Sequence, residues 1–237
     1  GGELDKARGK LKGNINATIR PSYLVESVTS LAKKDKELPG WRKNGFGMSW
    51  GRVVHNILEV MGKGEDEKLD LLAENALVAE GRDAGEKGKL LRLIDSILKS
   101  DFWQRIMKAE KRYFEIPFSI KTDSTVLRLD EWEERGERGA MAKKEERGSI
   151  KYDEISEREK LPIILTGAID LAFFEQDGWV IADYKTDEVG EGLENFVKYY
   201  GSQVQLYSKY WEEITKQKVK EAGLYFTSLD KWVKIYP

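Results

Sequence analysis

The sequence contains no cysteine among its 237 residues and only one histidine, His55. The absence of cysteine excludes disulfides, thiolate zinc sites, cysteine nucleophiles and iron–sulfur clusters. A single imidazole excludes any site within this chain that needs two histidines. A catalytic metal would therefore rely mainly on oxygen ligands, which favours Mg²⁺, with Mn²⁺ as a substitute.

Long apolar runs are also missing. No segment approaches the roughly 20 apolar residues that a membrane span needs, and no signal peptide opens the chain, so we expect no membrane association. The sequence also lacks a Gly-x-x-x-x-Gly-Lys-Ser/Thr phosphate loop. This absence excludes an ATP site, and with it an ATPase motor, from this stretch of sequence.

Charge is abundant and unevenly distributed. Residues 1–53 carry 11 Lys/Arg against 5 Asp/Glu, whereas residues 130–160 carry 8 against 11. The basic segment could meet phosphates, although an ordinary solvated surface is the simpler interpretation. We expect residues 1–20 to be a basic, loosely ordered segment or linker and residues 21–237 to be a single domain. The charged stretch at about 130–160 is expected to be an insertion in that domain, passive rather than a lid.

Hydrophobic periodicity changes along the chain. Helical spacing predicts helices over residues 21–32, 49–61, 69–77, 86–109 with a break near Ser100, and 193–216. Alternation predicts strands over residues 112–120, 126–129, 161–174, 179–186, 219–227 and 232–236. Gln176–Gly178 is a turn that joins two strands into a hairpin. The order of elements predicts an α/β fold, with a mixed central β-sheet flanked by helices and an N-terminal helical region.

The predicted hairpin carries three charged residues among apolar neighbours. Asp170 lies in its first strand, and Asp183 and Lys185 lie two positions apart on one face of its second. Burying these charges is costly unless a partner or a metal compensates. Two aspartates and a lysine suit metal-assisted hydrolysis of a phosphodiester. The alternative is a structural Asp–Lys pair at a strand end, and the preceding Gly167-x-x-Asp170 favours the functional interpretation.

Asp170…Asp183-x-Lys185 in this setting resembles the PD-(D/E)XK nuclease superfamily. More narrowly, it resembles the RecB/AddA-type nuclease domain at the C-terminus of bacterial helicase–nucleases. Four further segments match that family: Gly51-x-x-x-His55-x-x-Leu58-Glu59, Glu115-x-Pro117-Phe118, Asp183-Tyr-Lys-Thr-Asp187 and Tyr200-x-x-Gln203-x-x-x-Tyr207. Together the matches span about residues 21 to 226, and their order and spacing are more specific than any one of them.

The resemblance implies a restriction-endonuclease-like core and a Mg²⁺-dependent deoxyribonuclease, most simply an exonuclease. It implies that His55, Asp170, Asp183 and the backbone carbonyl of Tyr184 hold the metal. Lys185 would position or activate the attacking water. Gln203 and Tyr207 would lie beside the active centre, in contact with phosphate or with the catalytic lysine.

The same resemblance implies the biological setting. The expected partner is DNA, as single strands or duplex ends, and the expected process is double-strand break processing and recombinational repair in the bacterial cytoplasm. A helicase motor in the same full-length chain and a separate partner subunit are expected as well. A stand-alone exonuclease, or a silent domain that binds only DNA ends or a partner, is the alternative.

Three residues have a second interpretation that the sequence leaves open. His55 could be a boundary histidine that hydrogen-bonds to Glu59, one helical turn further on. Glu115 could extend the hydrogen bonds around the metal or simply face solvent. Tyr200 and Tyr207 could belong to the core, because a tyrosine stripe on a helix is more often packed than ligand-binding.

Overall fold

The computed structural model describes the chain in separate segments. These are residues 2–19, 22–34, 36, 47–64, 68–122, 161–190 and 192–236. The chain divides into two compact units, one made of Gly1–Glu26 with Ser119–Leu165 and the other of Ser27–Phe118 with Thr166–Pro237. None of the described helices combines the length and the apolar character needed to cross a bilayer. The predicted strand at 126–129 and the charged stretch at 130–160 lie outside the described residues.

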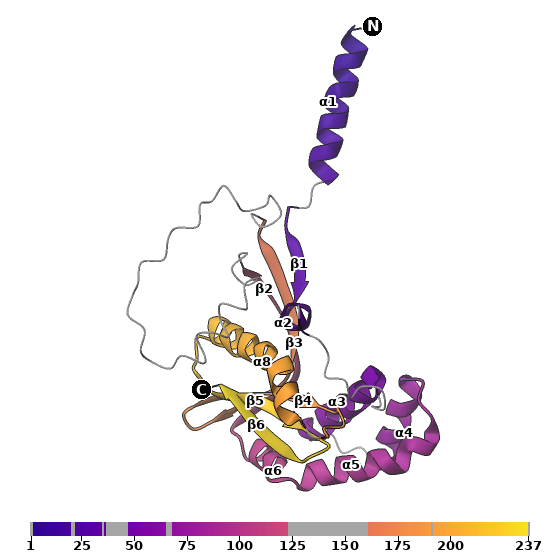
Figure 1. Cartoon of the computed structure of the whole chain (residues 1–237), viewed down its shortest axis with the longest axis vertical. Coiled ribbons are helices and arrows are strands. Elements are labelled where there is room, and N and C mark those ends of the chain that lie inside the picture. Colours follow the sequence, from indigo (N-terminus) through magenta and orange to yellow (C-terminus); the bar gives the residue numbers. More distant parts are fainter. Residues whose placement is uncertain are drawn as a thin grey trace. The chain divides into compact units, whose positions relative to one another are not determined.

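The first unit contains helix α1 (Gly2–Ile19) and most of strand β1 (Leu24–Ser27) (Figure 1). The sequence predicts a loosely ordered segment up to residue 20, whereas the structure places residues 2–19 in a helix. Glu3 and Asp5 lie in its first turn, where negative charge stabilises the exposed N–H groups. The division between linker and domain at residue 20 stays a prediction.

The helix predicted over residues 21–32 is wrong in its first half. Leu24–Ser27 form β1, and helix α2 spans only Val28–Lys33. The cause is Ser27, whose backbone is extended and whose Oγ accepts a hydrogen bond from Ser30 N at 3.0 Å. This is the geometry of a helix N-cap, so the helix begins only after Ser27.

The helices before the sheet in the second unit follow the predicted periodicity. They are α3 (Gly47–Lys63), α4 (Leu69–Ala79), the 3-10 turn η2 (Ala84–Glu86), α5 (Lys87–Lys99) and α6 (Asp101–Met107). The predicted apolar stripe of α3 is at most 2% exposed at Trp50, Val53, Val54, Ile57 and Leu58. The predicted break is confirmed, because Ser100 ends α5 and its Oγ accepts a hydrogen bond from Trp103 N in α6.

The strands form a mixed six-stranded sheet within the described residues. Besides β1 they are β2 (Lys111–Thr122), β3 (Ile163–Glu175), β4 (Gly178–Lys185), β5 (Val219–Phe226) and β6 (Lys231–Tyr236). The order is β1-β3-β4-β5-β6, with β2 paired to β3. The predicted hairpin is β3–β4, which is antiparallel. Strand β5 runs parallel to β4 and is reached through helix α8 (Leu193–Thr215), because parallel neighbours need a crossover.

The two faces of β4 carry different side chains. Val180, Ala182 and Tyr184 belong to the hydrophobic core formed with α3 to α6. On the opposite face, Asp183 accepts a hydrogen bond from Gln203 of α8 at 2.9 Å. Figure 1 shows α8 on one side of β4 and β5, with α3 to α6 on the other. Strand β4 is therefore covered on both faces, and Asp183 is only 1% exposed.

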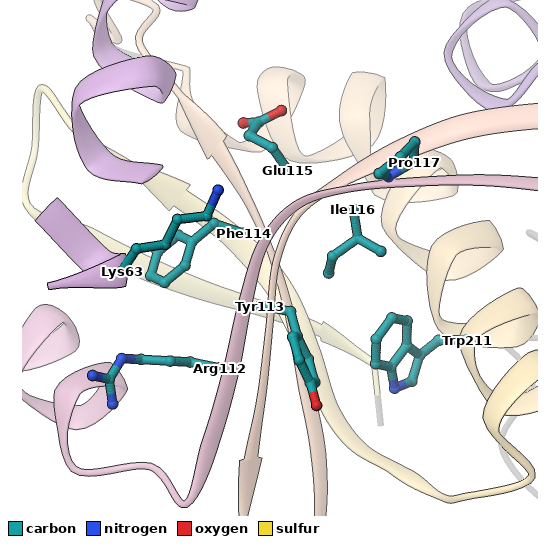
Figure 2. Close-up of a pocket in the computed structure, with 8 residues that line it drawn as sticks. All are labelled: Lys63, Arg112, Tyr113, Phe114, Glu115, Ile116, Pro117 and Trp211. Atoms are coloured by element: carbon teal, nitrogen blue, oxygen red, sulfur yellow. The ribbon is translucent and has the colours of Figure 1, made fainter. Parts of the chain in front are cut away.

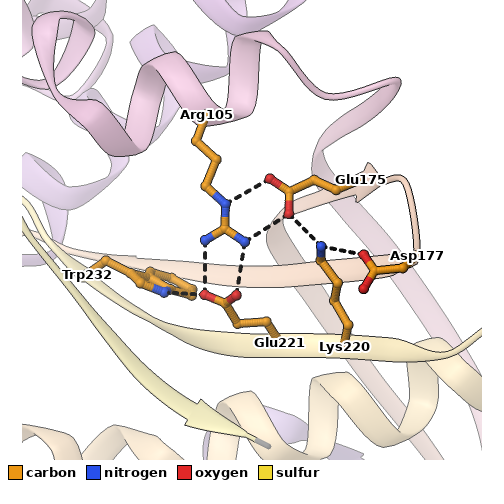
Figure 3. A network of polar contacts seen from close by, with 6 residues as sticks. All are labelled: Arg105, Glu175, Asp177, Lys220, Glu221 and Trp232. Carbon is orange, nitrogen blue, oxygen red and sulfur yellow. Dashed lines mark hydrogen bonds and ion pairs between the residues drawn. The ribbon is translucent and has the colours of Figure 1, made fainter.

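A network of ion pairs joins α6 to the hairpin and to β5 (Figure 3). The guanidinium of Arg105 donates to both carboxylate oxygens of Glu175 and both of Glu221, at 2.8–3.0 Å. Lys220 Nζ lies 2.9 Å from Glu175 Oε2 and 2.6 Å from Asp177 Oδ1. Hydrogen bonds from Arg105, outweighing burial, and from Lys220 lower the pKa of Glu175 to about 2.

Arg105→Met is expected to lower the free energy of unfolding by about 2 kcal/mol at pH 7, because it leaves Glu175 and Glu221 without their shared cation. This is less than a fully buried pair would lose, since the three side chains are 18–30% exposed. The stabilisation by Glu175 is present above its ordinary pKa of about 4.5 and is lost as pH falls toward 2. The difference between variant and wild type should therefore shrink in acid.

Denaturant unfolding at pH 7, 5 and 3 measures this difference. The control is Arg52→Met, because the Arg52 side chain is 60% exposed in its ion pair with Glu80. The control is expected to unfold like the wild type. Equal shifts for the two variants, or a difference for Arg105→Met that does not change with pH, would contradict this role of the network.

Candidate active site

The side chains of His55, Glu115 and Asp170 converge from α3, β2 and β3. One ligand atom of each lies within 4.8 Å of the other two. His55 Nδ1 is 3.0 Å from Glu115 Oε1 and 3.7 Å from Asp170 Oδ1. An imidazole nitrogen and two carboxylates form a donor set that could hold a divalent cation. We call these three residues the His/Glu/Asp cluster.

His55 lies on the flank of the buried stripe of α3, and its side chain is 24% exposed. The alternative that it bonds to Glu59 is wrong: Glu59 pairs with Lys63 at 2.6 Å, and the imidazole bonds to Glu115. The edge of the ring also meets Tyr184, with centroids 5.6 Å apart. These contacts direct the imidazole toward β2 and β3, where the carboxylates lie.

Glu115 enters the cluster through an unusual backbone conformation. Its φ is 46°, in the left-handed region, which costs a non-glycine residue roughly 1–2 kcal/mol. Its carboxylate lies against His55 and its side chain is 29% exposed. The sequence left open whether Glu115 contributes to the site, and the structure places it beside the predicted metal ligands. Pro117 signalled an irregular strand, but no sequence pattern revealed the direction of the Glu115 side chain.

The cluster carries more negative charge than its surroundings compensate. Asp170 is 8% exposed, and its Oδ2 accepts a hydrogen bond from Tyr184 N at 2.8 Å. Burial and the charge of Asp183 raise the pKa of Asp170. Burial disfavours the charged form of His55, but Asp170 and Glu115 outweigh this effect and raise its pKa to about 9. Crowded carboxylates that attract protons in this way are the chemistry that a divalent cation fits.

Asp183 lies next to the cluster rather than within it. Its Oδ1 accepts the hydrogen bond from Gln203 Nε2, and its Oδ2 forms an ion pair with Lys185. Its charge still acts on both His55 and Asp170. The predicted roles of Asp183 and of the Tyr184 carbonyl as metal ligands stay predictions.

Lys185 is held between a carboxylate and an aromatic ring. Its Nζ pairs with Asp183 and lies 4.1 Å from the centroid of the Tyr200 ring, whose hydroxyl donates to Asp187 Oδ2 at 3.1 Å. Burial disfavours the ammonium, but Asp183 and Asp170 outweigh burial and raise the pKa of Lys185. Lys185 is therefore charged at neutral pH. It is suited to orient water or to stabilise negative charge, and not to act as the base.

Gln203 and Tyr207 lie where the resemblance implies. Gln203 Nε2 donates to the Tyr207 hydroxyl at 3.0 Å as well as to Asp183, and both residues are at most 5% exposed. Within the described part of the chain, Gln203 Oε1 is buried without a hydrogen-bond partner. The Tyr207 ring packs edge-on against Phe118. This chain of contacts holds Asp183 from the α8 side, and the catalytic role of the two residues stays a prediction.

Two residues of the basic segment reach the same helix. Lys36 Nζ donates to Ser202 Oγ at 2.6 Å, and Lys33 Nζ lies 5.2 Å from the Tyr200 ring centroid. Tyr200 is also the residue beneath Lys185. Part of the positive charge predicted from residues 1–53 is therefore close to the active-site lysine.

The fold and these side chains together define a restriction-endonuclease-like nuclease domain. Its features are a mixed sheet whose central hairpin carries Asp170, Asp183 and Lys185, with His55 and Glu115 brought to the same end of the hairpin. The model of the PD-(D/E)XK nuclease superfamily matches residues 23–234, and the chain belongs to that superfamily. The predicted family and fold class are confirmed.

Three relatives are named as the same component of an ATP-dependent helicase/nuclease. The protein of Carboxydothermus hydrogenoformans is 35% identical over 223 residues, which is 92% of this chain. Those of Clostridium novyi and Clostridium perfringens strain 13 are 30% and 31% identical over 95% and 78% of this chain. The chain spans only 14–17% of the length of these relatives.

Proposed function

We propose that the chain is a Mg²⁺-dependent deoxyribonuclease domain, most simply an exonuclease. The observation that carries the proposal is the His/Glu/Asp cluster beside the buried Asp183–Lys185 pair. His55, Glu115 and Asp170 would hold the ion, with Asp183 and the Tyr184 carbonyl as further ligands. Bound Mg²⁺, or Mn²⁺ in its place, would supply an acidified water and offset negative charge on the phosphate.

The remaining side chains of the site position the reacting groups. The ammonium of Lys185 orients the attacking water and stabilises charge on the phosphate oxygens. Gln203 fixes one oxygen of Asp183 while Lys185 pairs with the other. Tyr207 fixes Gln203 in turn. Asp183 is thereby held in one orientation from both of its oxygens.

The names of the relatives support a wider proposal. The domain is the nuclease module of a helicase–nuclease that processes DNA double-strand breaks for recombinational repair in the bacterial cytoplasm. The helicase motor would lie in the remainder of a longer chain, since the relatives are about six times longer than the matched region. A partner subunit completes the proposed assembly, and the motor would deliver DNA strands to the site.

Incubation with end-labelled single-stranded and duplex DNA tests the function. We expect shortening of the labelled DNA with Mg²⁺ and none with EDTA. A silent DNA-binding domain would shift the mobility of the same DNA without cutting it under either condition. A stand-alone exonuclease would cut fully without a motor, and its gene would encode no helicase motifs.

Metal binding is expected to tighten by at least about tenfold between pH 6 and pH 8. His55, with a pKa of about 9, and Asp170, with a raised pKa, must release protons before they can bind an ion. Protons therefore compete with the metal most strongly at low pH. Calorimetric titration with Mn²⁺ in two buffers of different ionisation enthalpy measures both the affinity and the number of protons released.

His55→Gln is the informative variant for this titration. It is expected to bind Mn²⁺ more weakly at pH 8 and to release fewer protons per ion than the wild type. An affinity that is independent of pH, or an unchanged proton count in His55→Gln, would show that the metal does not displace a proton from His55.

A further inference from the structure

A cavity of about 540 Å³ borders the His/Glu/Asp cluster along β2 (Figure 2). Tyr113, Ile116, Pro117 and Trp211 form its apolar side, and Lys63 and Arg112 line it as cations. Glu115 lines the cavity too and is also the hydrogen-bond partner of His55. The cavity and the cluster therefore share a residue, and a molecule that fills one lies next to the other.

The backbone at Glu115 creates this connection. The left-handed conformation of Glu115 interrupts the regular alternation of the strand. Figure 2 shows the Glu115 carboxylate and the Ile116 side chain on opposite sides of β2. The metal cluster thus lies on one side of the strand, while Tyr113, Ile116 and Trp211 present an apolar surface on the other.

The lining of the cavity suits an aromatic ring that also has polar edges. Tyr113 is 49% exposed, although it is a large aromatic residue. Trp211 is only 7% exposed, and its Nε1 has no hydrogen-bond partner among the described residues. A nucleobase offers a flat face for stacking and carbonyl or ring-nitrogen acceptors at its edge. It satisfies both features at once.

The cations at the cavity suit a phosphate. Arg112 Nε donates to the Gly62 carbonyl at 3.0 Å, and in the described part of the chain Arg112 forms no ion pair with a carboxylate. Its guanidinium charge is thus available to an anionic ligand. Lys63 lies beside it and pairs with Glu59. A base on the apolar side and a backbone phosphate near Arg112 would match the two halves of the cavity.

A peptide strand is a poorer occupant. Within the described residues β2 pairs only with β3, so its other edge is the one a peptide strand would extend. Pro117 has no N–H to donate, and the distorted backbone at Glu115 disrupts the hydrogen-bonding edge between Tyr113 and Pro117. Strand addition needs a regular ladder there, whereas a stacked base does not.

We propose that this cavity binds an unpaired base of single-stranded DNA, next to the phosphate that the metal cluster acts on, with Arg112 contacting the backbone. The proposal rests on the nuclease function and adds the form of the substrate. A base in a duplex is stacked and paired on both sides, so it cannot enter a cavity of this kind without being unpaired.

Binding measured without cleavage tests the proposal. Fluorescence anisotropy of a labelled oligothymidylate, about 20 nucleotides long, in EDTA gives the dissociation constant of the whole chain. Tyr113→Ala is expected to weaken binding by roughly tenfold or more, in line with the loss of one stacked base. Tyr113→Phe keeps the ring and is expected to bind as the wild type does. Tyr23→Ala is the matched control, because Tyr23 is 51% exposed in the other unit.

A second readout places the base. A series of oligonucleotides, each with one abasic position, is expected to show weaker binding to wild type at only one or two positions. In Tyr113→Ala the same positions are expected to lose that effect. A blunt duplex should bind equally to wild type and to Tyr113→Ala.

The outcomes separate this proposal from the nuclease function. Mg²⁺-dependent cleavage together with unchanged single-strand binding in Tyr113→Ala, or with a flat abasic series, would overturn the base site and leave the nuclease standing. Equal weakening by Tyr23→Ala would overturn it as well. Absence of both DNA binding and cleavage in the wild type would overturn the two proposals together.

Discussion

Asp170→Asn is expected to slow Mg²⁺-dependent DNA cleavage by about 10³-fold or more while the protein stays folded. The amide removes a charged ligand from the His/Glu/Asp cluster but can still accept the hydrogen bond from Tyr184 N. Since burial and the charge of Asp183 raise the pKa of Asp170, its carboxylate is unfavourable in the metal-free protein. We therefore expect the metal-free variant to unfold at a higher temperature than the wild type.

Single-turnover cleavage and thermal unfolding in EDTA measure the two effects. Asp177→Asn is the control, because Asp177 lies in the turn of the same hairpin, is 72% exposed and bonds to Lys220. It is expected to keep the full cleavage rate. An Asp170→Asn variant that retains more than about a tenth of the activity would contradict the assignment of Asp170 to the metal. Lower thermal stability in EDTA would contradict the account of crowded negative charge.

Lys185→Met is expected to lower kcat by roughly 10²- to 10³-fold, the effect of removing one preorganised donor from a transition state. The affinity for metal is expected to hold or to rise, because Asp183 loses the cation that competes for its oxygen. The raised pKa of Lys185 argues for a charged side chain throughout the neutral range. The decrease in kcat is therefore expected to be similar at pH 7 and pH 9.

Lys209→Met is the matched control for this variant. Lys209 also lies over a tyrosine ring of α8, with Nζ 5.2 Å from the Tyr210 centroid, but it does not contact Asp183 or the cluster. Its kcat is expected to be unchanged. A Lys185→Met variant with a raised KM for DNA and an unchanged kcat would show that the lysine binds substrate without acting on the transition state.

The parts of the fold that periodicity specifies were predictable. The hairpin β3–β4 was predicted from alternating apolar residues on both sides of Gln176–Gly178, and the structure pairs Glu175 with Gly178. The buried stripe of α3 placed His55 on a flank of that helix in the same way. Both predictions depend on a single strong signal, the spacing of apolar residues.

Local capping and backbone conformation were harder to predict. Ser27 caps α2, so the apolar residues before it form a strand instead of extending the helix. A Cβ at Gly62 would lie 2.0 Å from the ring of Phe114, so the space that this glycine leaves on the helix flank is filled from β2. Both features depend on tertiary neighbours that the spacing of residues along the sequence does not encode.

The candidate site was predicted in its residues more fully than in its geometry. Asp170, Asp183, Lys185, Gln203 and His55 all lie at one end of the hairpin, as the family resemblance implied. The pairing of Asp183 with Lys185, and of His55 with Glu115, depends on side-chain directions at strand ends. The positive φ of Glu115 carries no signature in the sequence, so its place in the cluster could come only from the structure.

The most direct test of the metal centre is anomalous scattering from crystals of the protein soaked in Mn²⁺. One ion is expected at coordination distance, roughly 2.0–2.3 Å, from His55, Asp170 and Glu115, and absent from crystals of Asp170→Asn. The same map shows whether Asp183 turns from Lys185 to join the ion. A Mn²⁺ ion bound elsewhere while His55, Asp170 and Glu115 hold none would contradict the account.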